Sequence, residues 1–168
     1  MTAFLLQAVF ISLSGVMAPG PLSAAIVGHS HRSAHAGALG ALGHGVVELP
    51  LMALILFGFA TWADAPLVGP VVGIAGGLVL LWMGISMVVS VRDGLPAMAP
   101  EATDGSAFRA GVLLTVANPY FLVWWLSVGA ALLLRSTEYG GVGIVVFAGA
   151  HWLCDLAWLW FLSAAVHR

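Results

Sequence analysis

The sequence predicts an all-α membrane protein, built as a polytopic bundle of transmembrane helices. Of its 168 residues, 61% are hydrophobic and only 7% are charged, whereas about a quarter of the residues of a soluble domain are charged. Apolar runs of about 20 residues, the length that a helix needs to cross the hydrocarbon core, recur along the chain. We therefore expect a multi-pass protein of the plasma (inner) membrane, with the lipid bilayer as its main surroundings.

Five apolar runs reach the length of a transmembrane helix. A longer polar stretch at 92–109 separates the third run from the fourth and is the predicted hinge between two halves. The first run has no Lys or Arg before it and is too long for the core of a secretory signal, so we interpret it as a span. The five predicted spans are Phe4–Val27, Ala36–Trp62, Leu67–Val91, Ala110–Leu134 and Val142–Val166. The chain 1–168 is thus expected to form one membrane domain, with repeat one at 1–91 and an incomplete repeat two at 110–168.

The arginines predict the orientation of the bundle, because the chain contains no lysine. Arg32, Arg92, Arg109 and Arg168 fall on one predicted side of the membrane, and only Arg135 falls on the other. Cytoplasmic loops carry an excess of Lys and Arg. The sequence therefore predicts an extracytoplasmic N-terminus.

Two of the predicted spans contain helix-breaking residues. The first span carries Pro19, Gly20 and Pro21, and the fourth carries Asn118 followed by Pro119. Proline removes a backbone donor and kinks or ends a helix. Unwound backbone at membrane depth persists only where protein or an aqueous space satisfies its polar groups. We therefore expect these two breaks to be solute-binding positions, with an ordinary proline kink as the alternative.

Two other spans carry ionisable residues near their centres. His44 and Glu48 lie four residues apart in the second span, and His151 and Asp155 repeat this spacing in the fifth. Residues four apart share one helical face. A charged carboxylate costs about 2.5–3.5 kcal/mol at the bilayer centre, so such residues usually face the interior of a bundle and serve a function. The alternative is that each histidine only hydrogen-bonds its own carboxylate and helps to hold two helices together.

The two halves of the chain follow the same plan. In each half a broken span precedes a span with a His-x-x-x-Glu or His-x-x-x-Asp pair, and an odd number of crossings between the halves would invert one relative to the other. Secondary transporters often use such inverted repeats. Small residues four apart predict close helix packing within the chain or, as the other possibility, at a homodimer seam. These residues are Gly37, Ala41 and Gly45 in the second span and Gly69, Gly73 and Gly77 in the third.

Several of these residues together resemble a known family. The Pro19-Gly20-Pro21 element, the spaced glycines Gly37, Gly40, Gly43 and Gly45, and Asn118-Pro119 are similar to the LysE-type translocator family, in the lysine/homoserine exporter superfamily. The resemblance implies a small inner-membrane exporter of amino acids or related solutes, driven by an ion gradient rather than by ATP. The six spans usual in this family, in two sets of three, imply that this chain lacks the last helix.

The leading hypothesis is a proton-coupled exporter of an amino acid or a related small solute. Glu48 and Asp155 would carry the coupling proton, His44 and His151 would relay it, and the breaks at Pro19–Pro21 and Asn118-Pro119 would hold the solute. The alternative takes the same two imidazoles and two carboxylates as ligands of a divalent metal cation that the protein exports.

Other classes find little support in the composition. A net charge of −2 without a basic cluster gives no reason to expect nucleic-acid binding. The single cysteine, Cys154, excludes a disulfide or Cys-pair motif within the chain, and no nucleotide-binding loop indicates an enzyme. We expect no cofactor, although a haem protein with His44 and His151 as axial ligands is a remaining non-transporting possibility.

Overall fold

A computed structural model gives the fold of the chain. It describes residues 1–59 and 106–167 and, between these ranges, residues 71, 74, 78, 81, 82, 85, 88, 89 and 92. Throughout the described residues the regular structure is helical and contains no strand, which confirms the predicted all-α class. Most of the predicted third span, Leu67–Val91, and of the hinge at 92–109 lie outside the described residues, as do Gly69, Gly73 and Gly77.

The first predicted span is broken where its prolines lie. Helix α1 (Thr2–Val16) and helix α2 (Pro21–Ser30) meet at an angle of 75°. Gly20 caps α2 in an extended conformation, and Pro21 occupies the first turn of α2. Proline is favoured there because its missing N–H would have no helical partner anyway. The predicted break is therefore present, and α2 starts a new direction of the chain.

Helix α3 (Ala36–Phe59) carries the predicted small-residue seam and uses it within the chain. A Cβ atom added at Gly37 would meet the backbone carbonyl of Leu159 in the last helix, and one added at Gly43 would meet the backbone carbonyl of Phe108. Only glycine allows backbones to approach this closely. The seam of the second span is thus an internal packing seam, and the homodimer remains a prediction.

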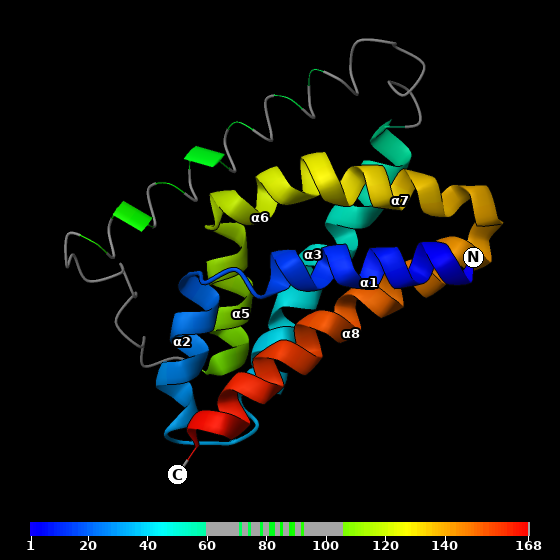
Figure 1. Cartoon of the computed structure of the whole chain (residues 1–168). Coiled ribbons are helices and arrows are strands. Elements are labelled where there is room, and N and C mark those ends of the chain that lie inside the picture. Colours follow the sequence, from blue (N-terminus) through cyan, green and yellow to red (C-terminus); the bar gives the residue numbers. More distant parts are fainter. Residues whose placement is uncertain are drawn as a thin grey trace.

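The second half begins with α5 (Ala107–Val116), three residues before the predicted start at Ala110. The fourth predicted span then breaks at Ala117 and Asn118, and the chain turns into a different direction (Figure 1). Asn118 stabilises the new start, because its Oδ1 accepts a hydrogen bond of 3.0 Å from the backbone N–H of Tyr120. The elements that follow are α6 (Pro119–Trp124), a π-helical turn η1 (Trp125–Gly129), α7 (Ala130–Ser136), a 3₁₀ turn η2 (Thr137–Tyr139) and α8 (Gly140–Val166).

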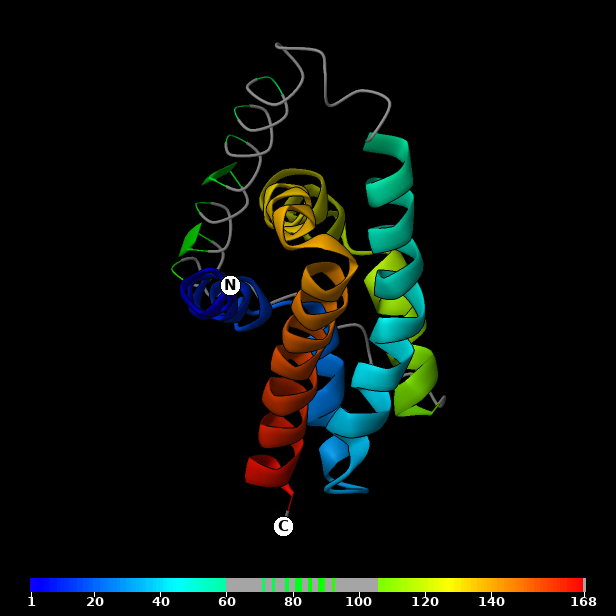
Figure 2. The ribbon, with the colours of Figure 1, turned by 90° about the vertical axis from the view of Figure 1, so that its right-hand side faces the viewer.

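The helices form a bundle in which α3 packs between α5 and α8, and α2 packs against the same two helices. Two views show α1 and the α6–α7 segment running across the direction of α2, α3 and α5 (Figures 1 and 2). The N-terminus lies beside the start of α8, and the C-terminus lies beside the α2–α3 connection (Figure 1). Near the N-terminus, Arg135 Nη1 donates a hydrogen bond of 2.8 Å to Gln7 Oε1, and near the C-terminus His167 Nδ1 lies 2.7 Å from the carbonyl oxygen of Ser30.

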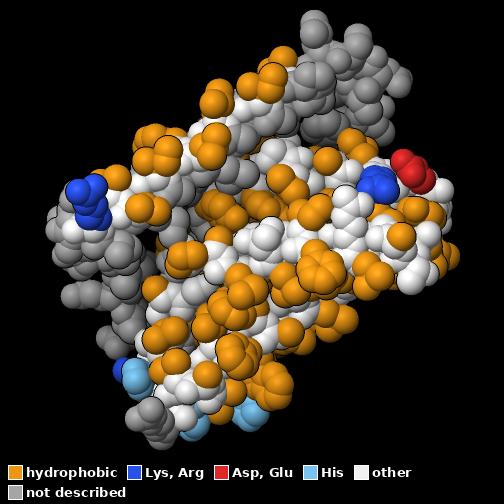
Figure 3. All heavy atoms as spheres, viewed as in Figure 1, with side chains coloured by type: hydrophobic (Ala, Val, Ile, Leu, Met, Phe, Trp, Pro, Cys, Tyr) orange, Lys and Arg blue, Asp and Glu red, His pale blue; other side chains and the backbone are white. Residues whose placement is uncertain are grey.

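Many large apolar side chains face outward and the ionisable residues of α3 and α8 face inward, as expected for a protein in lipid. Phe10 and Phe57 are 74% and 75% exposed, whereas Glu48 is 0% exposed. Hydrophobic side chains cover much of the visible face, and the charged ones lie near its ends (Figure 3). Within the described residues, two helical stretches, Ala36–Gly58 and Pro119–Val166, are long and apolar enough to cross a membrane, and the bent α1–α2 pair adds a third if it is counted as one span. The predicted number of five spans stays a prediction.

Candidate functional site

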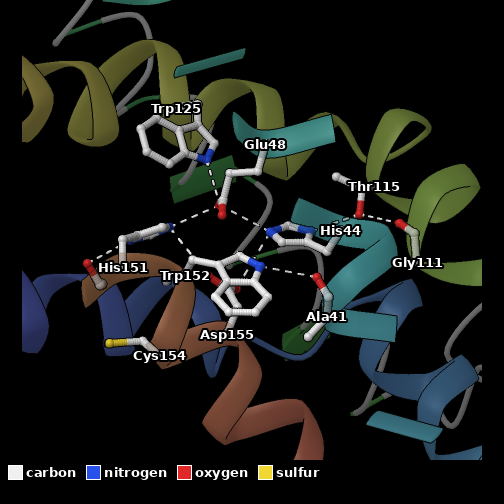
Figure 4. Close-up of polar contacts among 12 residues, drawn as sticks. Ala41, His44, Glu48, Gly111, Thr115, Trp125, His151, Trp152, Cys154 and Asp155 are labelled. Carbon is white, nitrogen blue, oxygen red and sulfur yellow. Dashed lines mark hydrogen bonds and ion pairs between the residues drawn. The ribbon is translucent and has the colours of Figure 1, made fainter. Parts of the chain in front are cut away.

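The four ionisable residues singled out in the sequence lie together at the centre of the bundle. His44 and Glu48 come from α3, and His151 and Asp155 come from α8 (Figure 4). All four are buried. We call this group the His-carboxylate cluster. Its side chains can lie together because each pair shares one face of its helix and α3 and α8 pack against each other.

Glu48 is the centre of the cluster. Its Oε1 atom lies 3.1 Å from the Nε2 atoms of both His44 and His151, and it accepts a hydrogen bond of 3.2 Å from the indole N–H of Trp125. Asp155 is more distant, with Oδ1 3.6 Å from His44 Nε2 and Oδ2 3.5 Å from His151 Nε2. The interpretation that each histidine serves only its own carboxylate is therefore wrong, because both imidazoles meet at Glu48.

Hydroxyl groups hold the far side of each imidazole. His44 Nδ1 lies 2.8 Å from Thr115 Oγ1 on α5, and His151 Nδ1 lies 2.7 Å from Ser12 Oγ on α1. Each histidine is thus held by the opening helix of the other half of the chain. This crossed arrangement ties the two halves together at the cluster, and it fixes the plane of both rings.

The hydrogen bonds of Thr115 determine where protons reside near His44. Thr115 Oγ1 donates a bond of 2.5 Å to the carbonyl oxygen of Gly111, which has no hydrogen to offer in return. Since a hydroxyl has one hydrogen, Thr115 must accept its other bond from His44 Nδ1–H. The His44 Nε2 contact with Glu48 then requires a further proton, either on the imidazole or on the carboxyl group. One exchangeable proton therefore lies between His44 and Glu48.

Aromatic rings from α6 and η1 enclose the cluster. Phe121 meets His44 edge-on at a centroid distance of 5.2 Å, and Trp124 stacks on His151 at 5.1 Å with an interplanar angle of 25°. Trp125 meets His151 edge-on at 5.0 Å. The π-helical turn begins at Trp125, the residue whose indole reaches Glu48. Such turns are frequent at functional sites because they redirect side chains.

The two predicted breaks also meet in space. A Cβ atom at Gly20 would lie 3.9 Å from Asn118 Nδ2, so the start of α2 faces the start of α6. The hydroxyl of Tyr120 reaches the carbonyl oxygen of Gly15 at 3.5 Å and connects the same two segments. Pro19, Pro21 and Pro119 flank this meeting point. Helix α6 connects this meeting point to the His-carboxylate cluster, because Phe121 follows the second break and its ring contacts the His44 ring.

The geometry also bears on the metal alternative. One potential ligand atom each from His44, Glu48 and Asp155 lies within 4.8 Å of the others, so these three could surround a cation.

Three residues that contact the cluster were not predicted from the sequence: Ser12, Thr115 and Trp125. Ser and Thr in a helix usually bond the carbonyl one turn back, and an interior Trp usually packs, so no pattern in the sequence distinguishes these three.

Comparisons with known proteins find a matching family and related sequences. The model of the LysE type translocator family matches residues 13–168. The amino acid efflux protein YcgF of Bacillus subtilis is 24% identical, over 91% of this chain and 75% of its own length. The threonine efflux protein of Escherichia coli K12 is 27% identical, over 76% of this chain and 66% of its own length. The chain thus spans about two thirds to three quarters of these relatives. No solved structure gives a significant match.

Proposed function

The chain belongs to the LysE type translocator family, and on this premise we propose that it is a secondary-active exporter of amino acids, driven by the proton gradient across the plasma membrane. Membership makes it a transporter and not an enzyme. The observation that carries the proposed coupling is the buried convergence of two carboxylates and two imidazoles from both halves of the chain. The names of the relatives favour amino acids over metal cations, so metal export is not proposed.

The cluster supports a role in proton coupling. Glu48 and Asp155 carry the coupling proton, and His44 and His151 pass it on, because an exchangeable proton already lies between His44 and Glu48. Imidazoles suit this task, since histidine ordinarily changes charge near neutral pH. A shift between inward-facing and outward-facing states would bring the cluster into contact with water on each side in turn, as expected if the two halves form an inverted repeat.

The paired breaks support a role in holding the solute. At the start of a helix the first backbone N–H groups have no partner within the helix, and the helix dipole favours negative charge there. The starts of α2 and α6 face each other around Gly20 and Asn118, with Pro19, Pro21 and Pro119 beside them. The solute carboxylate is proposed to bind between these two helix starts.

Replacing Glu48 with Gln tests the proposed coupling. The purified full chain is reconstituted into liposomes, and counterflow of labelled L-threonine and the other standard amino acids identifies a transported solute. Glu48→Gln should reduce export driven by a pH gradient to background, because the amide cannot take up the proton, while the protein remains inserted. Glu138→Gln is the matched control, since Glu138 is exposed in η2. Export that is unchanged by Glu48→Gln would contradict the proposal.

The N-terminus is proposed to lie outside the cell. The turn between α7 and α8 lies beside the N-terminus, and the connection between α2 and α3 lies beside the C-terminus (Figure 1). Because the α2–α3 connection contains Arg32, the positive-inside tendency supports an extracytoplasmic N-terminus. In a Cys154→Ala background, a membrane-impermeant maleimide added to whole cells should label Thr137→Cys and should leave Ser33→Cys unlabelled. The opposite labelling would reverse the orientation.

A further inference from the structure

The two carboxylates of the cluster differ in how their oxygens are satisfied. Glu48 Oε1 has three nitrogen neighbours, whereas Glu48 Oε2 and Asp155 Oδ2 are buried without a hydrogen-bond partner among the described residues. Asp155 Oδ2 has only the 3.5 Å ion-pair contact with His151 Nε2. A buried carboxylate oxygen without a donor carries a substantial desolvation cost, so each such atom requires an explanation. Two of them in one cluster indicate a position for a ligand that donates hydrogen bonds.

The spacing of the carboxylates fits a single donor atom with several hydrogens. Oxygens of Glu48 and Asp155 lie within 4.8 Å of each other. A nitrogen can donate to both, because two hydrogen bonds of about 2.8 Å together span up to about 5.6 Å. A primary ammonium has three N–H donors and one positive charge. It therefore matches the spacing of the two carboxylates and the negative charge of the pair, and its remaining hydrogens suit carboxylate oxygens that lack a donor.

The cluster has room for only a limited number of positive charges. The titratable groups that interact with the two carboxylates, within the described residues, are the imidazoles of His44 and His151 and, beside Asp155, the Cys154 thiol. The Cys154 side chain points away from the cluster (Figure 4). Two imidazolium ions balance the two carboxylates, so an added ammonium would be an unbalanced charge, which is costly at low dielectric. An ammonium and a full set of protons therefore exclude each other.

We propose that Glu48 and Asp155 bind the ammonium group of the exported amino acid, and that the ammonium displaces a proton held between the imidazoles and these carboxylates. The inference rests on the proposed function and assigns the amino group to the cluster, while the carboxylate of the solute remains at the helix starts. The displaced proton passes to water on the side to which the cluster is open, and no bond of the solute changes. The solute and the proton then bind alternately to the same site, which couples efflux of the amino acid to entry of the proton.

Proton release on binding tests this inference. The full chain in detergent and weak buffer, with a pH-sensitive dye, receives an amino acid that the reconstituted wild type transports, beginning with L-threonine. About one proton should appear per bound molecule, and the apparent Kd should rise about tenfold per pH unit as the pH falls, the limit for exchange of one proton. The methyl ester of the same amino acid keeps its ammonium and should also release a proton, whereas the N-acetyl derivative should release none.

Variants separate the site from the rest of the molecule. Glu48→Gln and Asp155→Asn should each remove proton release and weaken binding, while Glu138→Gln behaves as wild type. The ligand comparison on the wild type does not depend on how these variants fold. A pH-independent Kd, or equal binding of the N-acetyl derivative, overturns the inference while transport by the wild type still supports the proposed function. If the wild type transports no amino acid, the proposed function fails and this inference fails with it.

Discussion

Replacing Thr115 with Val probes the crossed support of the cluster. Thr115 is 2% exposed, and its hydroxyl is the acceptor for His44 Nδ1–H at 2.8 Å. Valine leaves this donor buried without a partner, which costs about 1–3 kcal/mol. The additional apolar methyl group returns less than about 1 kcal/mol. The free energy of unfolding should therefore fall by about 1–2 kcal/mol, measured by reversible unfolding in mixed detergent micelles.

The matched control is Thr137→Val. Thr137 is exposed in η2 and bonds only the nearby carbonyl oxygen of Leu134, at 2.6 Å, so the same replacement should change stability by less than about 0.5 kcal/mol. Thr115→Val should also slow pH-driven export, because His44 loses its fixed orientation, and Ser12→Ala should act in the same direction through His151. Equal stability and equal export for the variants of Thr115 and Thr137 would refute the role given to these hydroxyls.

Two further predictions concern packing and the centre of the cluster. Gly43→Ala should lower the free energy of unfolding by about 1–3 kcal/mol, and with it the melting temperature of the purified protein, because the new Cβ would meet a backbone carbonyl of α5. Gly149→Ala should be neutral or slightly stabilising, because a Cβ at Gly149 has nothing within 4 Å. Equal melting temperatures for the two variants would count against the close α3–α5 seam. Trp125→Phe should reduce pH-driven export while the protein stays folded, because Glu48 Oε1 loses a hydrogen bond of 3.2 Å. Trp160→Phe, at a half-exposed position, should leave export unchanged. Equal export by the two variants in the flux assay would argue against a role for the Trp125 indole.

The breaks and the ionisable pairs were predictable because their signals are local. Proline cannot donate a backbone hydrogen bond, so the breaks at Pro19–Pro21 and Asn118-Pro119 follow from residue type alone. Helical periodicity places His44 beside Glu48 and His151 beside Asp155. The cost of burying a carboxylate in an apolar helix then predicts that both pairs face the inside of the bundle, where the structure places them.

The crossed contacts were not predictable, because they depend on how helices distant in sequence pack. Ser12 contacts His151 across 139 positions of the chain, and Thr115 contacts His44 across 71. A single hydroxyl in an apolar helix normally bonds its own backbone, so nothing at either position indicates a partner.

The sequence by itself determined that this protein lies in a lipid bilayer, that it is helical and where two of its helices break. Apolar composition, helical periodicity and proline chemistry can each be read without knowing which helices pack together. Only the tertiary structure decided that Glu48 is shared by both histidines and that the two breaks face each other. The physical reason is that burial cost requires a polar group to find some partner, while the packing of α3, α5 and α8 selects which one.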